Sequence, residues 1–218
     1  MMQKLFYRAA KFFLGPISLW FVAGIKGFDN IPNKGPFVIV ANHSSYIDPV
    51  IIKVIFEKYF NKIVYYLSKK EVYNNFLKRF IFVSSSTIPV DREKPGKVTL
   101  DAALIKLREG NIIGLFPEGT RSRDGKLHRG KTGAVRLALA AKCAVLPIGI
   151  KNSYEIWPRS KLLPKFKKGI EVNIGKPISL EKYYKKRVTK TMLRQITKKI
   201  MLEVGKLSGQ EYVDVSSL

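Results

Sequence analysis

The residue types best suited to acid–base chemistry occur together in the segment NHSSYID, residues 42–48. His43 directly follows the apolar run PFVIVA, which is typical of a buried strand, so it should lie at that strand's carboxyl end. Asp48 comes five residues later, at the start of a predicted helix, and a turn between them could bring its carboxylate onto one imidazole nitrogen. The carboxylate would fix the tautomer and stabilise the imidazolium, leaving the other nitrogen to accept a proton. The segment therefore predicts a general base and the residue that orients it.

Two other interpretations of this segment stay open. An Asp before Pro at a helix start is commonly an N-cap, so Asp48 alone would not indicate catalysis. Ser44 or Ser45 could be a nucleophile, although adjacency in sequence does not supply the geometry that a nucleophile and its base require.

Polar residues also follow two other predicted strands. The segment FPEGTRS comes just after the apolar run NIIGLF; in it Glu118 can accept hydrogen bonds from hydroxyls, and Gly119 allows a ligand to approach the backbone. Arg121 offers a planar guanidinium suited to phosphate, and Arg92 follows the strand STIPV in the same way. Surface ion pairs are the alternative for both arginines. Three polar groups that all follow strands favour a shared site.

The segment GKLHRGKT, residues 125–132, fits the pattern of a nucleotide-binding phosphate loop. Such a loop follows a strand directly and opens a helix. Here the helix is present, but eight residues separate Gly125 from the preceding strand, and no strand ending in a magnesium-binding Asp is evident. We therefore expect a loop that begins a helix and binds at most an anion there, with His128 as a loop residue.

The elements that must position these residues alternate along the chain, and they predict an α/β domain with a largely parallel central sheet flanked by helices. Sites in such folds gather at the carboxyl ends of the strands. The predicted strands are residues 36–42, 62–68, 86–90, 111–116, 144–150 and 170–175. The predicted helices are residues 49–60, 71–82, 96–109 and 132–142, with a C-terminal helix whose apolar stripe is Leu193, Ile196, Ile200, Val204 and Leu207.

The N-terminal residues 1–27 are rich in apolar and aromatic residues, with basic residues and no acidic one. The uncharged run from Phe12 to Ile25 has a break at Gly15-Pro16 and is shorter than the ~20 residues that span a membrane. We expect two short amphipathic helices that dock on a membrane interface, followed by a catalytic domain at residues 28–218. A signal peptide and helices packed on the protein's own core are the alternatives.

The net charge of the protein indicates an anionic partner but does not say which kind. Forty Lys and Arg oppose 16 Asp and Glu, a formal net charge of +24, so an anionic partner is implied: nucleic acid, an anionic membrane or a phosphate-bearing substrate. Residues 151–199 are the most basic region, either as a solvated face or as a surface attracted to anionic lipid or a polyanionic carrier. No nucleic-acid-binding module is recognisable. One cysteine and two histidines make a metal cluster improbable.

Four segments, in order, resemble the motif blocks of the glycerolipid acyltransferases, and most of all the 1-acyl-glycerol-3-phosphate (lysophosphatidate) acyltransferases. The blocks extend over about half of the chain, and their combination is far more specific than the His–Asp spacing alone. The segments are NHSSYID, STIPVDR, FPEGTRS and VLPIGI.

The resemblance implies a role for each matching residue. His43 would be the general base that deprotonates the acceptor hydroxyl, with Asp48 as its orienter. Arg92 and Arg121 would bind the lysophosphatidate phosphate. The part of the third block that lines the glycerol site would be Glu118, Gly119 and Thr120.

The implied reaction moves a fatty acyl group from acyl-CoA or acyl carrier protein to the sn-2 hydroxyl of lysophosphatidate, giving phosphatidate for phospholipid biosynthesis. It requires no metal or other cofactor, because a thioester already has a good leaving group. The enzyme would be monotopic or peripheral, at the cytoplasmic face of the cell membrane. Glycerol-3-phosphate or another lysolipid is the alternative acceptor, and a non-catalytic protein that binds anionic lipid is the alternative of another class.

Overall fold

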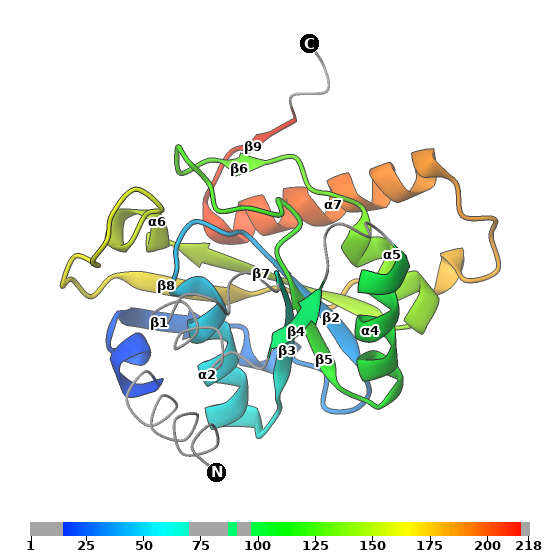
Figure 1. Ribbon diagram of the computed structural model, residues 1–218, viewed down its shortest axis with the longest axis horizontal. Helices are drawn as coiled ribbons and strands as arrows, with labels where there is room; N and C mark the ends of the chain where they lie inside the picture. The colour runs from blue at the N-terminus through cyan, green and yellow to red at the C-terminus, as the bar shows by residue number, and fades with distance from the viewer. Residues whose placement is uncertain (1–14, 70–86, 91–96, 215–218) are drawn as a thin grey trace.

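A seven-stranded sheet with helices on both faces forms the centre of the protein (Figure 1). The computed structural model describes residues 15–69, 87–90 and 97–214. The strands lie in the order β1-β8-β7-β2-β5-β3-β4. They are β1 Val22–Lys26, β2 Phe37–Ala41, β3 Val64–Lys69, β4 Thr87–Val90, β5 Ile112–Leu115, β7 Ala144–Lys151 and β8 Ile170–Ile174. The short strands β6 Leu127–His128 and β9 Tyr212–Val213 pair separately.

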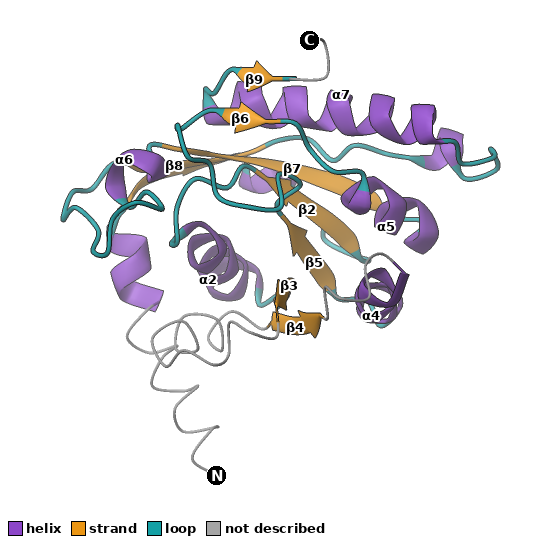
Figure 2. Ribbon diagram, turned by 45° about the horizontal axis from the view of Figure 1, so that its top comes forward, coloured by secondary structure: helices purple, strands orange, loops and turns teal. Residues whose placement is uncertain are grey.

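Helix α2 covers one face of the sheet, and helices α4, α5 and α7 cover the other (Figure 2). The helices are α2 Asp48–Phe60, α4 Lys97–Arg108, α5 Gly133–Ala141, α6 Ser153–Ile156 and α7 Lys190–Ser208, with 3₁₀ turns at Phe28–Asn30 and Glu181–Tyr183. Strand β2 is buried along its whole length because it lies between the two layers. Four of the five residues in the predicted apolar stripe of α7 pack in the core on the second face, and the fifth, Leu207, is half-buried.

The predicted α/β fold with a largely parallel sheet is confirmed. Every strand pair of the main sheet is parallel except β7–β8, which is antiparallel. The six predicted strands and the helices expected near residues 49–60, 96–109 and 132–142 are all present. The helix expected at residues 71–82 lies outside the described residues.

The expectation for the N-terminal segment needs a correction. Residues 15–20 are helical, which agrees with a second helix beginning near Pro16. Residues 22–26, however, form strand β1, which pairs with β8, so the end of the segment that we assigned to membrane-docking helices belongs to the sheet. A short apolar run of this kind is compatible with either helix or strand, and pairing with β8 decides it. The first predicted helix lies outside the described residues, and within them no helix is both long and apolar enough to span a membrane.

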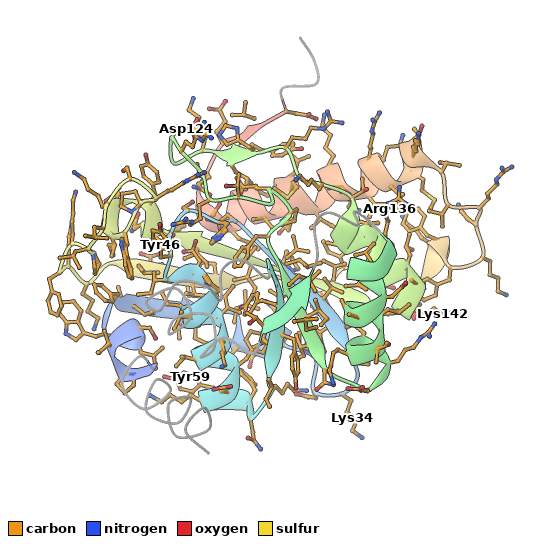
Figure 3. The ribbon with its side chains drawn as sticks, viewed as in Figure 1. Lys34, Tyr46, Tyr59, Asp124, Arg136 and Lys142 are labelled. Atoms are coloured by element: carbon orange, nitrogen blue, oxygen red, sulfur yellow. The ribbon has the colours of Figure 1, made fainter. Side chains whose placement is uncertain are left out.

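The parallel strands β2, β5 and β3 have their carboxyl ends on the same side of the sheet, which we call the active-site edge. The loops after these strands meet there. Figure 3 shows this edge by Tyr46, in the loop after β2, with Asp124 above it, whereas Lys34 and Tyr59 mark the opposite edge. Carboxyl ends of parallel strands are where sites form in such sheets.

Candidate active site

His43 and Asp48 are in contact, as their spacing predicts. The imidazole Nδ1 lies 3.0 Å from Asp48 Oδ2. The same oxygen accepts hydrogen bonds from the backbone N–H groups of Ser44 and Ser45, both at 2.7 Å. Asp48 is completely buried, and its other oxygen, Oδ1, has no hydrogen-bond partner. The carboxylate binds the His43 ring and amides that precede α2 rather than those of its first turn, and the N-cap residue is Ile47, so Asp48 does not cap the helix.

Two aromatic rings support the imidazole from the neighbouring strands. Phe116, which follows β5, stacks on His43 with 4.1 Å between ring centroids and 20° between planes. Tyr66 of β3 lies parallel to Phe116, at 5.8 Å and 6°. Burial, and then the charge of Asp48, raise the pKa of Tyr66 well above its ordinary value. The His–Asp pair therefore has an apolar surface on one side, where electrostatic interactions are stronger than in water.

The loop FPEGTRS is tied directly to the backbone of His43. Ser122 N donates to His43 O at 2.7 Å, and His43 N donates to Glu118 Oε1 at 3.0 Å. Glu118 Oε2 accepts from the backbone N–H of His128 at 3.1 Å. Burial outweighs these two hydrogen bonds and raises the pKa of Glu118 to about 7. Both oxygens of Glu118 thus hold backbone in place, while the contact with a substrate hydroxyl that we expected of it stays a prediction.

Gly119 is favoured by the backbone conformation of the turn, and the Lys131 side chain lies beside it. Its φ is +74°, and a Cβ built on it would lie 2.9 Å from Lys131 Nζ. The space beside Gly119 that we expected a ligand to use is therefore next to the Lys131 ammonium. Sequence reasoning missed Lys131 as a member of the site, although it belongs to the segment GKLHRGKT.

Arg121 lies flat on a tyrosine. Its Cζ is 3.3 Å from the centroid of the Tyr46 ring, and its buried Nη1 has no hydrogen-bond partner. A buried guanidinium nitrogen without an acceptor is costly, and an anionic ligand would satisfy it. Thr120, the residue before it, accepts a hydrogen bond from Arg159 Nη1 at 3.3 Å. Arg92 lies outside the described residues.

Two side chains that sequence reasoning missed connect the strands and loops at the active-site edge. Asn42 exchanges hydrogen bonds with Ile150 N and O, both at 2.8 Å, and so locks the end of β2 to β7. Gln210, which follows α7, accepts from Asn42 Nδ2 and donates to Ser44 Oγ and to Gly125 O. Asn42 could have been suspected from its place beside His43, but no local signal marks Gln210.

The alternatives for these segments gain no support. Ser44 Oγ accepts from Gln210 and Ser45 Oγ accepts from Ile47 N, so both hydroxyls are engaged away from the imidazole. In GKLHRGKT the strand β6 lies inside the pattern instead of before it, which a phosphate loop does not allow. His128 Nε2 lies 2.9 Å from Asp124 Oδ1 at the surface. Within the described ranges, no three His, Cys, Asp or Glu residues gather as metal ligands.

A basic cavity of about 320 Å³ adjoins Thr120. It lies between Arg123, which directly follows FPEGTRS, and α6 with the residues after it; Tyr154 Oη of α6 donates to Arg123 O at 2.8 Å. The cavity is lined by Arg123, Tyr154, Pro158, Arg159 and Ser160. The guanidinium groups of Arg123 and Arg159 make the cavity beside Thr120 positive.

The fold and this geometry define an α/β protein whose imidazole–carboxylate pair is placed for general-base chemistry at the carboxyl end of a central strand. The model of the acyltransferase family matches residues 23–151. The chain therefore belongs to the acyltransferase family and is an O-acyltransferase.

Two curated relatives and one solved structure support this assignment. The chain is 31% identical over 195 residues to a 1-acyl-sn-glycerol-3-phosphate acyltransferase of Borreliella burgdorferi, covering 84% of this chain and 75% of the relative. It is 35% identical over 164 residues to the enzyme of that name from Bacillus subtilis, covering 71% and 74%. The crystal structure of the 1-acyl-sn-glycerophosphate acyltransferase PlsC from Thermotoga maritima has the same fold, with a TM-score of 0.69 at 22% identity over 94% of this chain and 80% of that one.

Proposed function

We propose that the protein transfers a fatty acyl group from a thioester donor to the sn-2 hydroxyl of 1-acyl-glycerol-3-phosphate, giving phosphatidate. The observation that carries the proposal is the contact between His43 Nδ1 and Asp48 Oδ2 at the end of β2. Relatives that are about one-third identical are named for this acceptor, which supports the choice of lysophosphatidate. A protein that only bound anionic lipid would have no use for a buried carboxylate on an imidazole.

The pair accounts for the proton that the reaction must move. With Nδ1–H donated to Asp48, the other ring nitrogen, Nε2, takes the proton from the acceptor hydroxyl as its oxygen attacks the thioester carbonyl. The tetrahedral intermediate collapses, the carbon–sulfur bond breaks, and the thiolate takes the proton back from the imidazolium. Asp48 stabilises the imidazolium between the two steps. No residue of the protein is acylated.

Arg121 and Lys131 are the described groups best placed to hold the acceptor phosphate, with Arg92 as the further ligand that the sequence predicts. Arg121 Nη1 is a buried donor without an acceptor, and Lys131 lies beside Gly119 in the same loop. An anchored phosphate would keep the hydroxyl near His43, which saves the entropy of orienting it. The turn that follows β5 would line the glycerol site with Glu118, Gly119 and Thr120.

We place the reaction at a lipid surface, at the cytoplasmic face of the cell membrane, with the enzyme peripheral or monotopic. The net charge of +24 supports this, because anionic headgroups attract basic surfaces. Acyl-CoA and acyl carrier protein are both anionic, so either donor suits the same charge.

The test is transfer by purified protein from each donor to lysophosphatidate, with glycerol-3-phosphate as a competing acceptor. His43→Ala should lower turnover by about 10²–10⁴-fold, the usual contribution of a general base. His128→Ala is the matched control, since its ring bonds to Asp124 at the surface and the His128 backbone N–H that binds Glu118 is kept, and it should keep near-normal turnover. Normal turnover of a folded His43→Ala variant would refute the mechanism, and a preference for glycerol-3-phosphate would replace the acceptor.

A further inference from the structure

The segment between α6 and β8, residues 157–169, exposes its most apolar side chains. Three of them are the most exposed large hydrophobic residues in the described part of the chain: Leu162 at 82%, Leu163 at 74% and Phe166 at 81%. We call these three side chains the apolar tip. A water-soluble surface rarely gathers so much apolar area in one place unless it contacts a partner.

Hydrogen bonds fix the backbone of this segment to the rest of the protein. Lys165 N donates to Ile156 O at 2.8 Å, and Gly169 N donates to Phe21 O at 3.0 Å, so both arms are fixed to the protein. Trp157 Nε1 donates to Lys161 O at 3.3 Å across the base of the loop. These bonds hold the backbone while the apolar tip points away from the core.

A second element extends the apolar surface. Trp20, from the helix at residues 15–20, lies 4.5 Å from Phe166 between ring centroids, and it is itself 45% exposed, with Ile17 at 50%. Figures 1 and 2 both show this helix next to the loop between α6 and β8. Amphipathic aromatic rings such as tryptophan favour the level of lipid headgroups.

Cations surround the apolar tip. The loop carries five basic residues and no acidic one, and no ion pair in the described ranges involves any of the five. They are Arg159, Lys161, Lys165, Lys167 and Lys168. An apolar tip ringed by lysines matches an anionic bilayer, where the lysines meet headgroups and the apolar side chains enter the acyl boundary.

The loop also leads directly to the candidate active site. Trp157 at its base packs on Tyr46, 5.4 Å between centroids, and Tyr46 carries Arg121 on its face. Arg159 donates to Thr120 and lines the basic cavity beside it. A lipid that left the bilayer at this loop would therefore meet the arginines of the site first.

We propose that residues 157–169 form a lipid-inserting loop, whose apolar tip enters an anionic bilayer together with Trp20 and sets the active-site edge against the headgroups. The proposal rests on the part of the proposed function that places the reaction at a lipid surface, and it does not depend on the donor or the acceptor. An acidic carrier protein would match the lysines but not three protruding apolar side chains.

Insertion can be measured separately from catalysis. The only native cysteine, Cys143, is buried and its pKa is raised to about 11, so a cysteine placed at Leu163 in the full chain can be labelled selectively with an environment-sensitive fluorophore. Vesicles of phosphatidylcholine and phosphatidylglycerol should shift its emission to the blue, and nitroxide-labelled lipids should quench it. The matched control is Ile105→Cys on α4, a helix that lies on the other side of the molecule from the loop (Figure 1). Ile105 is 55% exposed, so a label there should keep the emission of a label in water.

A second set of variants asks what the apolar tip contributes. The triple change L162S/L163S/F166S should lower partitioning into these vesicles by at least about tenfold, because the gain from apolar insertion is lost. Transfer to a short-chain, water-soluble acceptor should stay within about twofold, since the side chains are exposed and lie outside the active site. The triple change I105S/V188S/L202S, at other exposed positions, should bind vesicles like the parent protein.

The outcomes separate the two proposals. A label at Leu163 that enters the bilayer supports the lipid-inserting loop even if no phosphatidate is formed, in which case the proposed function fails alone. The lipid-inserting loop is refuted if the label stays in water on bound protein, if the protein does not bind the vesicles at all, or if the label responds to acyl carrier protein and not to lipid.

Discussion

Asp48 concentrates three hydrogen bonds on one oxygen, because Oδ2 accepts from the His43 ring and from two backbone amides. Asp48→Asn can keep this acceptor but removes the negative charge that stabilises the imidazolium. We expect turnover to fall by about 10²–10⁴-fold with a small change in thermal stability. The double variant with His43→Ala should be no slower than His43→Ala alone, because the two residues act as a unit. Additive losses in steady-state kinetics would show that Asp48 acts independently of the base.

Glu118 makes stability depend on pH in an unusual direction. Burial raises the pKa of Glu118 from 4.5 to about 7, so between these values the folded protein binds a proton that the unfolded chain has released. The contribution of Glu118 to the free energy of unfolding is therefore fully present below about pH 4.5 and falls as pH rises to about 7, by about 3 kcal/mol.

Glu118→Gln removes this titration. The deficit in unfolding free energy of the variant relative to wild type should therefore shrink by about 3 kcal/mol between about pH 4.5 and pH 7. Urea unfolding of both proteins at several pH values measures it. A difference that does not change with pH would mean that the pKa of Glu118 is the same in the folded protein as in the unfolded chain.

The distance along the chain decides which contacts of the site are predictable. His43 and Asp48 are five positions apart, so a single turn has to bring them together, and the sequence is sufficient. The bond from His43 N to Glu118 spans 75 positions, and the bond from Gln210 to Ser44 spans 166. Such bonds depend on how strands are ordered in the sheet, and neither composition nor local spacing encodes that order.

At the level of elements, the predicted strands agree with the structure where an apolar run is bounded by turn residues on both sides. Strand β1 was missed because VAGIK continues an apolar segment that begins in a helix, and only its partner β8 distinguishes strand from helix. The antiparallel pairing of β7 with β8 was not predictable for the same reason, since it depends on which edge β8 joins.

Gly114 of β5 leaves room for the Tyr66 ring, and the position of that ring affects the active site. A Cβ there would overlap Tyr66 Cε1, and Tyr66 supports the Phe116 ring that stacks on His43. Gly114→Ala should therefore destabilise the protein by about 1–3 kcal/mol and lower turnover, because the ring stack must shift. Gly133→Ala is the control: no atom lies within 4 Å of its added Cβ, and α5 should gain up to about 1 kcal/mol. Unfolding and steady-state kinetics would contradict the idea if both variants behaved alike.

At the scale of the whole molecule, the active-site edge and the lipid-inserting loop lie at one end of the sheet (Figure 1). The net charge of +24 belongs to the protein as a whole. Charge attracts the protein to an anionic bilayer from any orientation, since it acts over about 10 Å at 0.1 M salt. The apolar tip then selects one orientation, because it gains free energy only where it enters the acyl region. Long-range attraction and local insertion thus have different physical origins and respond to different conditions.

Salt should separate these two contributions. Raising NaCl from about 0.1 M to about 1 M shortens the screening length from about 10 Å to about 3 Å, so partitioning into vesicles that contain phosphatidylglycerol should fall by at least about tenfold. Transfer to a bilayer-borne acceptor should fall in parallel, whereas transfer to a short-chain, water-soluble acceptor should change much less. On the fraction that stays bound at high salt, a label at Leu163 should remain blue-shifted, because insertion does not depend on screening. Partitioning that ignores salt would instead mean that the positive charge serves the anionic substrates and not the approach to the membrane.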